Sequence, residues 1–213
     1  MPLQNRVTPF GTIERSPARG MFTGNRGCLH DANKQLVREY QVRRWIICVL
    51  EFKGRRAELM RPGYYTHLFF LDEATALAAG HRPCAECQRE RFSDFRGHWA
   101  AANPDVAGGS APRADLIDSV LHRERVAGGR ARAARRKVTY QERLGNLPDG
   151  AFVTLADAGP ALLVLGGRVY PWSHAGYGDP IALSADTVVS VLTPRSTVRA
   201  LAHGYTPVIA PVP

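Results

Sequence analysis

The first half of the chain carries two segments in which apolar and polar positions alternate. β-Branched and aromatic residues dominate 43–55 and 63–72, and this pattern predicts two β-strands. The sequence RPG at 61–63 places a turn between them. We therefore expect a sheet in the first third of the chain.

Helical spacing follows directly after the second of these segments. Residues 72–80 predict a short helix, with Asp72 as its N-cap and Gly80 at its end. A longer helix is predicted over 88–102, because aromatic residues recur there at helical spacing. The aromatic stripe consists of Phe92, Phe95 and Trp99.

The middle of the chain is rich in glycine and arginine. Residues 103–113 combine Gly, Pro and small side chains, so they predict a linker. A helix is predicted over 114–126, and a basic run interrupted by two glycines follows at 127–138. We expect this run to form a flexible arm that becomes ordered on a polyanion.

The last third predicts strands and one closing helix. Apolar segments separated by Pro and Gly turns predict strands over 150–156, 161–167, 168–172 and 186–193. A final helix is predicted over 193–204, with Thr193 as N-cap, Pro194 at the first helical position and Gly204 as C-cap. The whole pattern predicts an α+β fold.

Composition narrows the class of protein. The 213 residues include 28 basic and 19 acidic ones, for a net charge of +9, and such a balance attracts nucleic acid. Nearly all the cations are arginine, which is also typical of a GC-rich genome. The sequence has no apolar run of about 18 residues and no secretory h-region, so we expect a cytoplasmic protein without a membrane partner.

The sequence GHRPCAEC at 80–87 is the sharpest chemical signal. A C-x-x-C turn directs two thiolates to one tetrahedral ion, at Zn–S distances of about 2.3 Å. Cys28 and His30, in a glycine-bounded loop, would complete a closed Cys3His zinc site with Cys84 and Cys87. Cys48 is the competing fourth ligand, but its place within a predicted strand is typical of a buried cysteine. We therefore favour the loop residues.

Two other uses of a cysteine pair are less compatible with the sequence. A thioredoxin-like pair follows a strand and opens a long helix, whereas this pair follows a predicted short helix. A zinc deaminase carries His-x-Glu before its Pro-Cys-x-x-Cys, whereas the His-x-Glu of this sequence, His122-Arg123-Glu124, comes after the cysteine pair. The metal-site interpretation is the strongest of the three.

The stretch FFLDEATALAAGHRPCAEC, residues 69–87, resembles the zinc-binding domain of the bacterial alkylated-DNA repair protein Ada. The shared pattern is an aromatic strand end, a short acidic and Ala-rich helix, and Arg-Pro-Cys-x-x-Cys. The resemblance implies a four-ligand zinc site in a small α/β domain whose relatives contact the DNA backbone. Within it, Cys84 and Cys87 would be the second ligand pair.

This sequence also departs from the Ada pattern. The family's first ligand pair is two cysteines four apart, one of which accepts a methyl group, whereas Cys28 is followed by His30. His81 also replaces the usual aromatic residue before Arg82. The resemblance therefore implies zinc binding more strongly than self-methylation.

These observations together predict three parts of the chain. They are an Ada-like zinc-binding domain at 1–104, a basic linker and helix at 105–137, and a small β-rich domain at 138–213. The expected phosphate contacts are Arg26, Arg82, Arg130, Arg132, Arg135, Arg136 and Lys137. In the last part, Trp172, His174 and Tyr177 lie in a predicted loop whose aromatic groups could stack on bases, but we favour the alternative that Trp172 and Tyr177 close the core.

The main hypothesis is a zinc protein that binds nucleic acid, DNA more than RNA, with zinc in a structural role. An enzyme acting on nucleic acid or nucleotides is the alternative, and its candidate groups are Asn25, Arg26, His30, Asp31 and His174. A third hypothesis is a partner-binding zinc protein whose basicity is only compositional.

Overall fold

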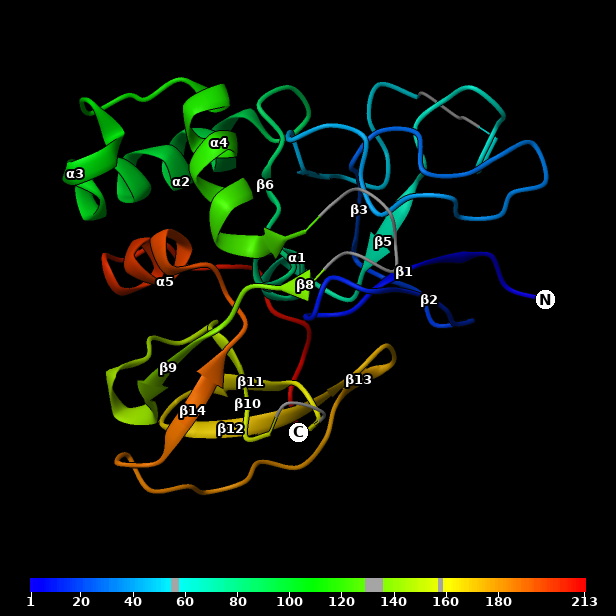
Figure 1. Cartoon of the computed structure of the whole chain (residues 1–213). Coiled ribbons are helices and arrows are strands. Elements are labelled where there is room, and N and C mark those ends of the chain that lie inside the picture. Colours follow the sequence, from blue (N-terminus) through cyan, green and yellow to red (C-terminus); the bar gives the residue numbers. More distant parts are fainter. Residues whose placement is uncertain (55–57, 129–135, 157–158) are drawn as a thin grey trace.

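The computed structural model (Figure 1) describes residues 1–54, 58–128, 136–156 and 159–213, which form two six-stranded sheets, one two-stranded sheet and five α-helices. Strands and helices occur in both halves of the chain, so the predicted α+β class is confirmed. None of the helices in these ranges combines the length and apolarity that a membrane crossing requires.

The first sheet is mixed and has the strand order β2-β1-β5-β3-β4-β6. Its strands are β1 (Gln4–Val7), β2 (Ile13–Arg15), β3 (Phe22–Asn25), β4 (Ile46–Cys48), β5 (Leu68–Phe70) and β6 (Arg82–Pro83). The predicted strands at 43–55 and 63–72 are confirmed only over three residues each, as β4 and β5. The parallel pairs β1–β5 and β4–β6 join segments far apart in sequence.

Four helices follow β5 in the chain, and three of them were predicted. They are α1 (Glu73–Ala78), α2 (Arg89–Ala102), α3 (Pro104–Ala107) and α4 (Ala114–Arg125). The Asp72 side chain accepts a hydrogen bond from the Thr75 backbone and caps α1, as predicted. The aromatic stripe of α2 is buried, which confirms its orientation toward the core. The unpredicted α3 lies within the predicted linker.

The second sheet is antiparallel throughout, in the order β13-β12-β11-β10-β14-β9. Its strands are β9 (Tyr140–Arg143), β10 (Phe152–Thr154), β11 (Leu162–Leu165), β12 (Arg168–Ser173), β13 (Gly176–Tyr177) and β14 (Val188–Val191). A 3-10 turn, η2 (Leu144–Asn146), follows β9. All four strands predicted for this part are present.

The closing helix, α5 (Arg195–Ala202), begins later than predicted. Its N-cap is Pro194, and no side chain caps it. The hydroxyl of Thr193, the expected cap, instead accepts a hydrogen bond from the Phe152 backbone at 2.9 Å. The capping prediction was therefore wrong at Thr193, because this hydroxyl satisfies the backbone of β10.

Two buried carboxylates of α1 hold the C-terminal segment in place. Asp72 accepts hydrogen bonds from the Tyr177 hydroxyl at 2.6 Å and from the Ala210 backbone at 2.9 Å. Glu73 accepts from the Tyr205 hydroxyl and from the Val208 backbone, and Arg91 forms an ion pair with it. Both carboxylates are fully buried, so these bonds offset their desolvation.

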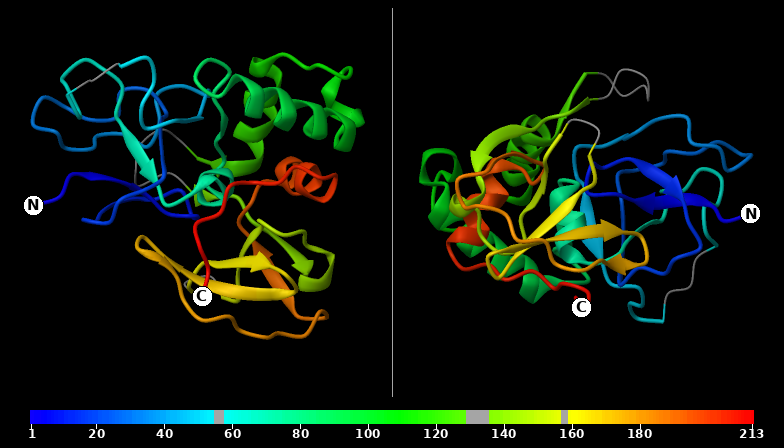
Figure 2. Two further views of the ribbon diagram at one scale, coloured as in Figure 1. Left: turned by 180° about the vertical axis from the view of Figure 1, so that it is seen from behind. Right: turned by 90° about the horizontal axis from the view of Figure 1, so that it is seen from below.

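The result is a molecule in which α1 lies between the two sheets, with α2 to α5 gathered on one side (Figure 1). The C-terminal segment runs from α5 past α1 to the second sheet (Figure 2). One hydrophobic core contains Ile47 of the first sheet, Phe95 of α2 and Val153 of the second sheet. The two halves therefore share a core.

Candidate metal centre

The end of β4 and the turn after β6 bring two cysteines together. The two strands pair in parallel, with Ile46 opposite Arg82 and Ile47 opposite Pro83. The next residue of each strand is a cysteine, and the Cys84 backbone donates to the Ile47 carbonyl at 2.9 Å. The register of this strand pair thus places Cys48 beside Cys84.

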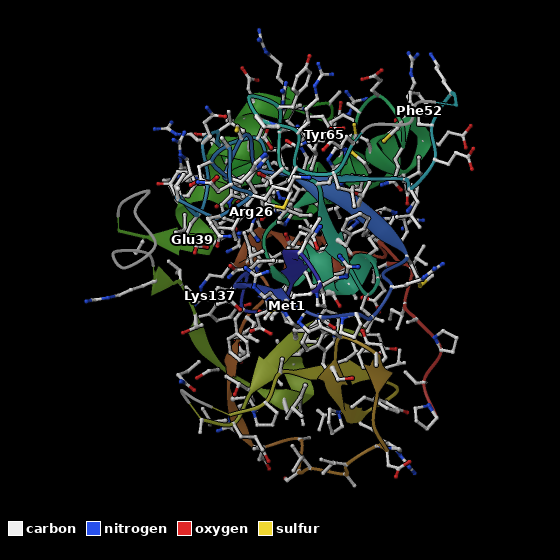
Figure 3. The ribbon with its side chains drawn as sticks, turned by 90° about the vertical axis from the view of Figure 1, so that its right-hand side faces the viewer. Met1, Arg26, Glu39, Phe52, Tyr65 and Lys137 are labelled. Atoms are coloured by element: carbon white, nitrogen blue, oxygen red, sulfur yellow. The ribbon has the colours of Figure 1, made fainter. Side chains whose placement is uncertain are left out.

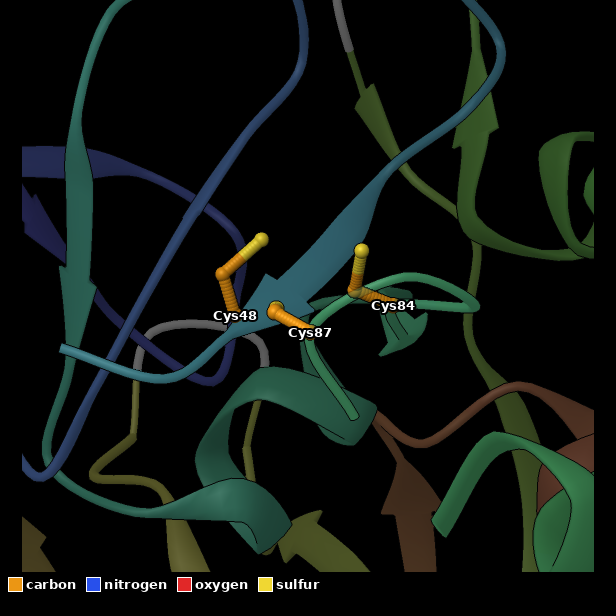
Figure 4. Close-up of side chains that lie close together, drawn as sticks. All are labelled: Cys48, Cys84 and Cys87. Carbon is orange, nitrogen blue, oxygen red and sulfur yellow. The ribbon is translucent and has the colours of Figure 1, made fainter. Parts of the chain in front are cut away.

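The turn between β6 and α2 adds the third thiol. The Gln88 backbone donates to the Cys84 carbonyl at 3.1 Å, and the Gln88 side chain donates to the Ile47 carbonyl at 2.8 Å. This closed turn returns Cys87 toward β4. The Sγ atoms of Cys48, Cys84 and Cys87 all lie within 4.8 Å of one another (Figure 4).

Hydrogen bonds concentrate negative charge on Cys84. The Cys48 thiol and the backbone N–H groups of the turn donate to its sulfur, and they lower the pKa of Cys84 to about 5 although burial opposes ionisation. The Glu86 N–H is one of these donors, at 3.4 Å. The hydrogen bond that the Cys48 thiol donates to Cys84 raises the pKa of Cys48, and burial of Cys48 raises it further. Burial also raises the pKa of Cys87. The cluster therefore favours one thiolate beside two thiols until a cation arrives.

The cluster forms part of the wall of a cavity of ≈ 580 Å³. The apolar wall consists of Ile46, Val49, Leu50, Phe52, Leu59, Tyr65 and Phe69, and the polar wall includes Thr23, Asn25, His67 and Glu86. Phe52 and Tyr65 lie at the end of the molecule that carries the first sheet (Figure 3). The sulfur atoms thus adjoin a largely apolar space, a setting that favours thiolate–metal bonds over hydrated ions.

The spacing of the sulfur atoms is compatible with a metal ion. Two sulfurs bound to one tetrahedral zinc lie about 3.8 Å apart, because each Zn–S bond measures about 2.3 Å. The three Sγ atoms lie within 4.8 Å of one another, so a movement of about 1 Å or less brings each pair to that separation. The cluster can therefore hold a metal ion, and soft thiolates select zinc, copper(I) or iron–sulfur clusters over magnesium or calcium.

No protein-family model, curated protein or solved structure matches this chain. The resemblance of 69–87 to the Ada-type zinc domain therefore remains a prediction, and the chemistry of the centre rests on its own residues.

The expected ligands Cys28 and His30 are not part of the cluster. The Cys28 thiol donates to the His30 carbonyl at 3.6 Å, and the ring nitrogens of His30 contact the Thr66 hydroxyl at 2.6 Å and the Arg61 carbonyl at 3.2 Å. The sequence analysis favoured these loop residues over Cys48, whereas in the structure Cys48 is the residue that lies with Cys84 and Cys87. The parallel pairing of β4 with β6 is the reason, and a local sequence pattern does not reveal it.

Arg26 and Arg82 were expected to contact phosphate, and their burial contradicts this expectation. The Arg26 guanidinium lies 4.0 Å from the ring centroid of Trp45 and donates to the Gly11 carbonyl at 2.9 Å. Arg82 forms two hydrogen bonds with the Asp118 carboxylate, at 3.0 and 2.9 Å. Both guanidinium groups are thus held by partners inside the protein.

Part of the basic run lies outside the described residues, namely Arg130, Arg132 and Arg135. Its two ends are joined by the antiparallel pair β7 (Val126–Ala127) and β8 (Arg136–Lys137). Arg136 is exposed, whereas Lys137 is half-buried and donates to the Ala78 carbonyl. Of the expected phosphate contacts in the described part of the chain, Arg136 is thus the exposed one.

A second group of arginines was not predicted. Arg43, Arg44, Arg96 and Arg113 line a groove of ≈ 930 Å³ above the buried Arg82–Asp118 pair. The first two follow Val42 in the loop before β4, and the others belong to α2 and to the start of α4. The adjacent pair Arg43-Arg44 could have indicated this basic surface from the sequence, but both residues were assigned to a predicted strand.

The polar groups proposed for an enzyme are dispersed. The Asp31 carboxylate accepts from the Asn33 and Gln35 backbones, and Asn25 lines the cavity at the metal centre. His174 contacts the Glu14 carboxylate at 3.0 Å. Trp172 donates to the Thr75 hydroxyl at 3.0 Å, and Tyr177 is buried, as the core interpretation expects. These contacts join the second sheet to the first half of the molecule.

Proposed function

We propose that this protein binds zinc through Cys48, Cys84 and Cys87 and uses the resulting fold to bind nucleic acid. The observation that carries the proposal is the cluster of three Sγ atoms. Zinc is the ion of choice because thiolates suit it and because a C-x-x-C turn is a common half of its structural sites. The resemblance to the Ada-type domain agrees with this choice.

A zinc ion at this position would hold the N-terminal fold together. It would connect β4 to the turn between β6 and α2. Without the metal, these two elements are joined by the short β4–β6 pairing and by the hydrogen bond from the Gln88 side chain to the Ile47 carbonyl. Structural zinc contributes about 10–16 kcal/mol of apparent binding free energy in small zinc-finger peptides. Metal binding would therefore add substantially to the stability of the first sheet.

Metal analysis of the purified protein tests the zinc assignment. Protein prepared without added metal should contain one zinc per chain, and a strong chelator should lower its thermal midpoint as it removes the zinc. A preparation that holds no metal, and gains none when zinc is added under reducing conditions, would contradict the proposal. Stoichiometric iron with visible charge-transfer bands would assign a different metal to the same ligands.

Nucleic-acid binding is supported by the distribution of exposed cations. The net charge is +9, and the groove gathers Arg43, Arg44 and Arg96 on one surface, with Arg113 paired to Asp115 at its edge at 3.2 Å. Arg43 and Arg44 are exposed, so both guanidinium groups can reach a phosphate. DNA is the proposed ligand, because the zinc-domain resemblance involves contacts with the DNA backbone.

Salt dependence tests whether these arginines contact phosphate. The double variant Arg43→Gln/Arg44→Gln should bind duplex DNA more weakly and reduce the slope of log K against log[salt] by about 2, since each lost phosphate contact changes it by about 1. The matched control is Arg143→Gln/Arg168→Gln, which removes the same charge from exposed positions of the second sheet. Equal slopes for the two variants would show that only net charge matters.

A further inference from the structure

We propose that His67 supplies the fourth ligand of the metal centre and completes a Cys3His site. The proposal rests on the zinc centre described above and adds a residue to it. Structural zinc is almost always four-coordinate, so three cysteines leave one position to be filled. The cavity beside the cysteines determines which residues can fill it.

The strand register places His67 on the same face of the sheet as Cys48. Thr23 of β3 is opposite Cys48 on one side and opposite Phe69 on the other. His67 precedes Phe69 by two residues, and alternate residues of an extended chain point to the same face. His67 and all three cysteines accordingly line one cavity.

The imidazole of His67 also has an unused ligand atom. Its Nδ1 is buried and has no hydrogen-bond partner in the structure. Leaving a buried nitrogen unsatisfied costs about 1–3 kcal/mol, and a bound ion is one of the features that explain such atoms.

The other cysteine and histidine residues of this region, Cys28, His30 and His81, do not line the cavity. Residues 55–57, 129–135 and 157–158, which are outside the described part, contain neither cysteine nor histidine. His30 contacts Thr66 and Arg61. His81 is fully buried against Trp45 and Phe70 and accepts from Arg26, and although its Nδ1 also lacks a partner, the residue does not line the cavity. His67 is thus the one histidine among the residues lining the cavity.

Coordination requires the ring to turn toward the sulfur atoms. His67 does not belong to the group of ligand atoms within 4.8 Å, and its ring centroid lies 4.5 Å from that of Tyr65. Rotation of the side chain into the cavity would exchange this ring contact for a bond to the metal. Metal sites of this kind commonly complete themselves as the ion binds.

Cobalt substitution tests this ligand directly. Co²⁺ should give wild-type protein the intense visible bands of a tetrahedral ion together with thiolate charge-transfer absorption. His67→Ala should weaken Co²⁺ and Zn²⁺ affinity at least about 100-fold, because even outer-shell partners of metal ligands contribute about 10–100-fold. His67→Cys should restore tight tetrahedral binding with stronger thiolate absorption. His203→Ala, which removes an exposed histidine of the C-terminal half, is the matched control and should behave as wild type.

The possible outcomes separate the two proposals. A wild type that takes up neither ion would overturn the metal centre itself. A wild type that binds metal, beside a His67→Ala variant with the same affinity and visible bands, would overturn only the role of His67 and leave the fourth position to water. Should His67→Ala prove unfolded by circular dichroism, the affinity and spectrum of His67→Cys decide the question.

Discussion

Cys48→Ser should abolish zinc binding and lower the thermal midpoint to that of chelator-treated wild-type protein. The change exchanges sulfur for oxygen at the end of β4 and removes one of the three clustered ligands. Structural zinc sites contribute about 10–16 kcal/mol of apparent binding free energy, so this is the largest single effect that we expect. Zinc content and thermal unfolding, each with and without chelator, measure it.

Cys28→Ser is the matched control for that experiment, because Cys28 donates its thiol to a backbone carbonyl and does not belong to the cluster. This variant should keep one zinc per chain and retain its response to chelator. The opposite pattern, with zinc lost from Cys28→Ser and kept in Cys48→Ser, would reinstate the ligand set favoured by the sequence alone.

The second large effect concerns the buried ion pair of Arg82 and Asp118, whose side chains are 2% and 7% exposed. Arg82→Ala should destabilise the protein by about 3–5 kcal/mol, because it leaves the carboxylate buried without its cation. Urea unfolding at neutral pH measures the loss. Replacing both partners, as in Arg82→Met/Asp118→Leu, should recover much of the stability, since no buried charge then remains.

The pH dependence of this variant has a definite sign. Burial already raises the pKa of Asp118, with Arg82 opposing the shift, so removal of Arg82 should raise that pKa further above its value in the unfolded chain. A carboxyl with a raised folded-state pKa costs stability as the pH rises through that pKa. Arg82→Ala should therefore be closer to wild type at acidic pH than at neutral pH. Wild-type stability combined with weaker DNA binding would instead return Arg82 to a phosphate-contacting role.

The sequence predicted those elements whose signals are local. Asp72 as an N-cap and the aromatic stripe of α2 each depend on residues within a few positions, and both are confirmed. The strands β1, β2 and β3 were missed, because QNRV, IER and FTGN contain few apolar residues and depend on partners elsewhere in the chain. Short mixed strands of this kind are stabilised mainly by tertiary packing.

The candidate site follows the same division. Cys84 and Cys87 were predicted from their spacing, whereas Cys48 joins them through the β4–β6 register. The environment of Arg26 also depends on residues far away in the sequence. The Arg26 guanidinium lies 4.0 Å from the ring centroid of Trp45, and the Arg125 guanidinium lies 3.9 Å from the same centroid. Formal charge counts both arginines as available to polyanions, although burial removes each of them from the surface.

The carboxylates at the start of α1 also have a consequence for the order of events during synthesis. Asp72 and Glu73 receive backbone hydrogen bonds from Ala210 and Val208, which follow them in the sequence by 138 and 135 residues. Until those residues have left the ribosome, both carboxylates lack these partners and remain better solvated than buried. The space between the two sheets can therefore close around α1 only once Val208 and Ala210 are available.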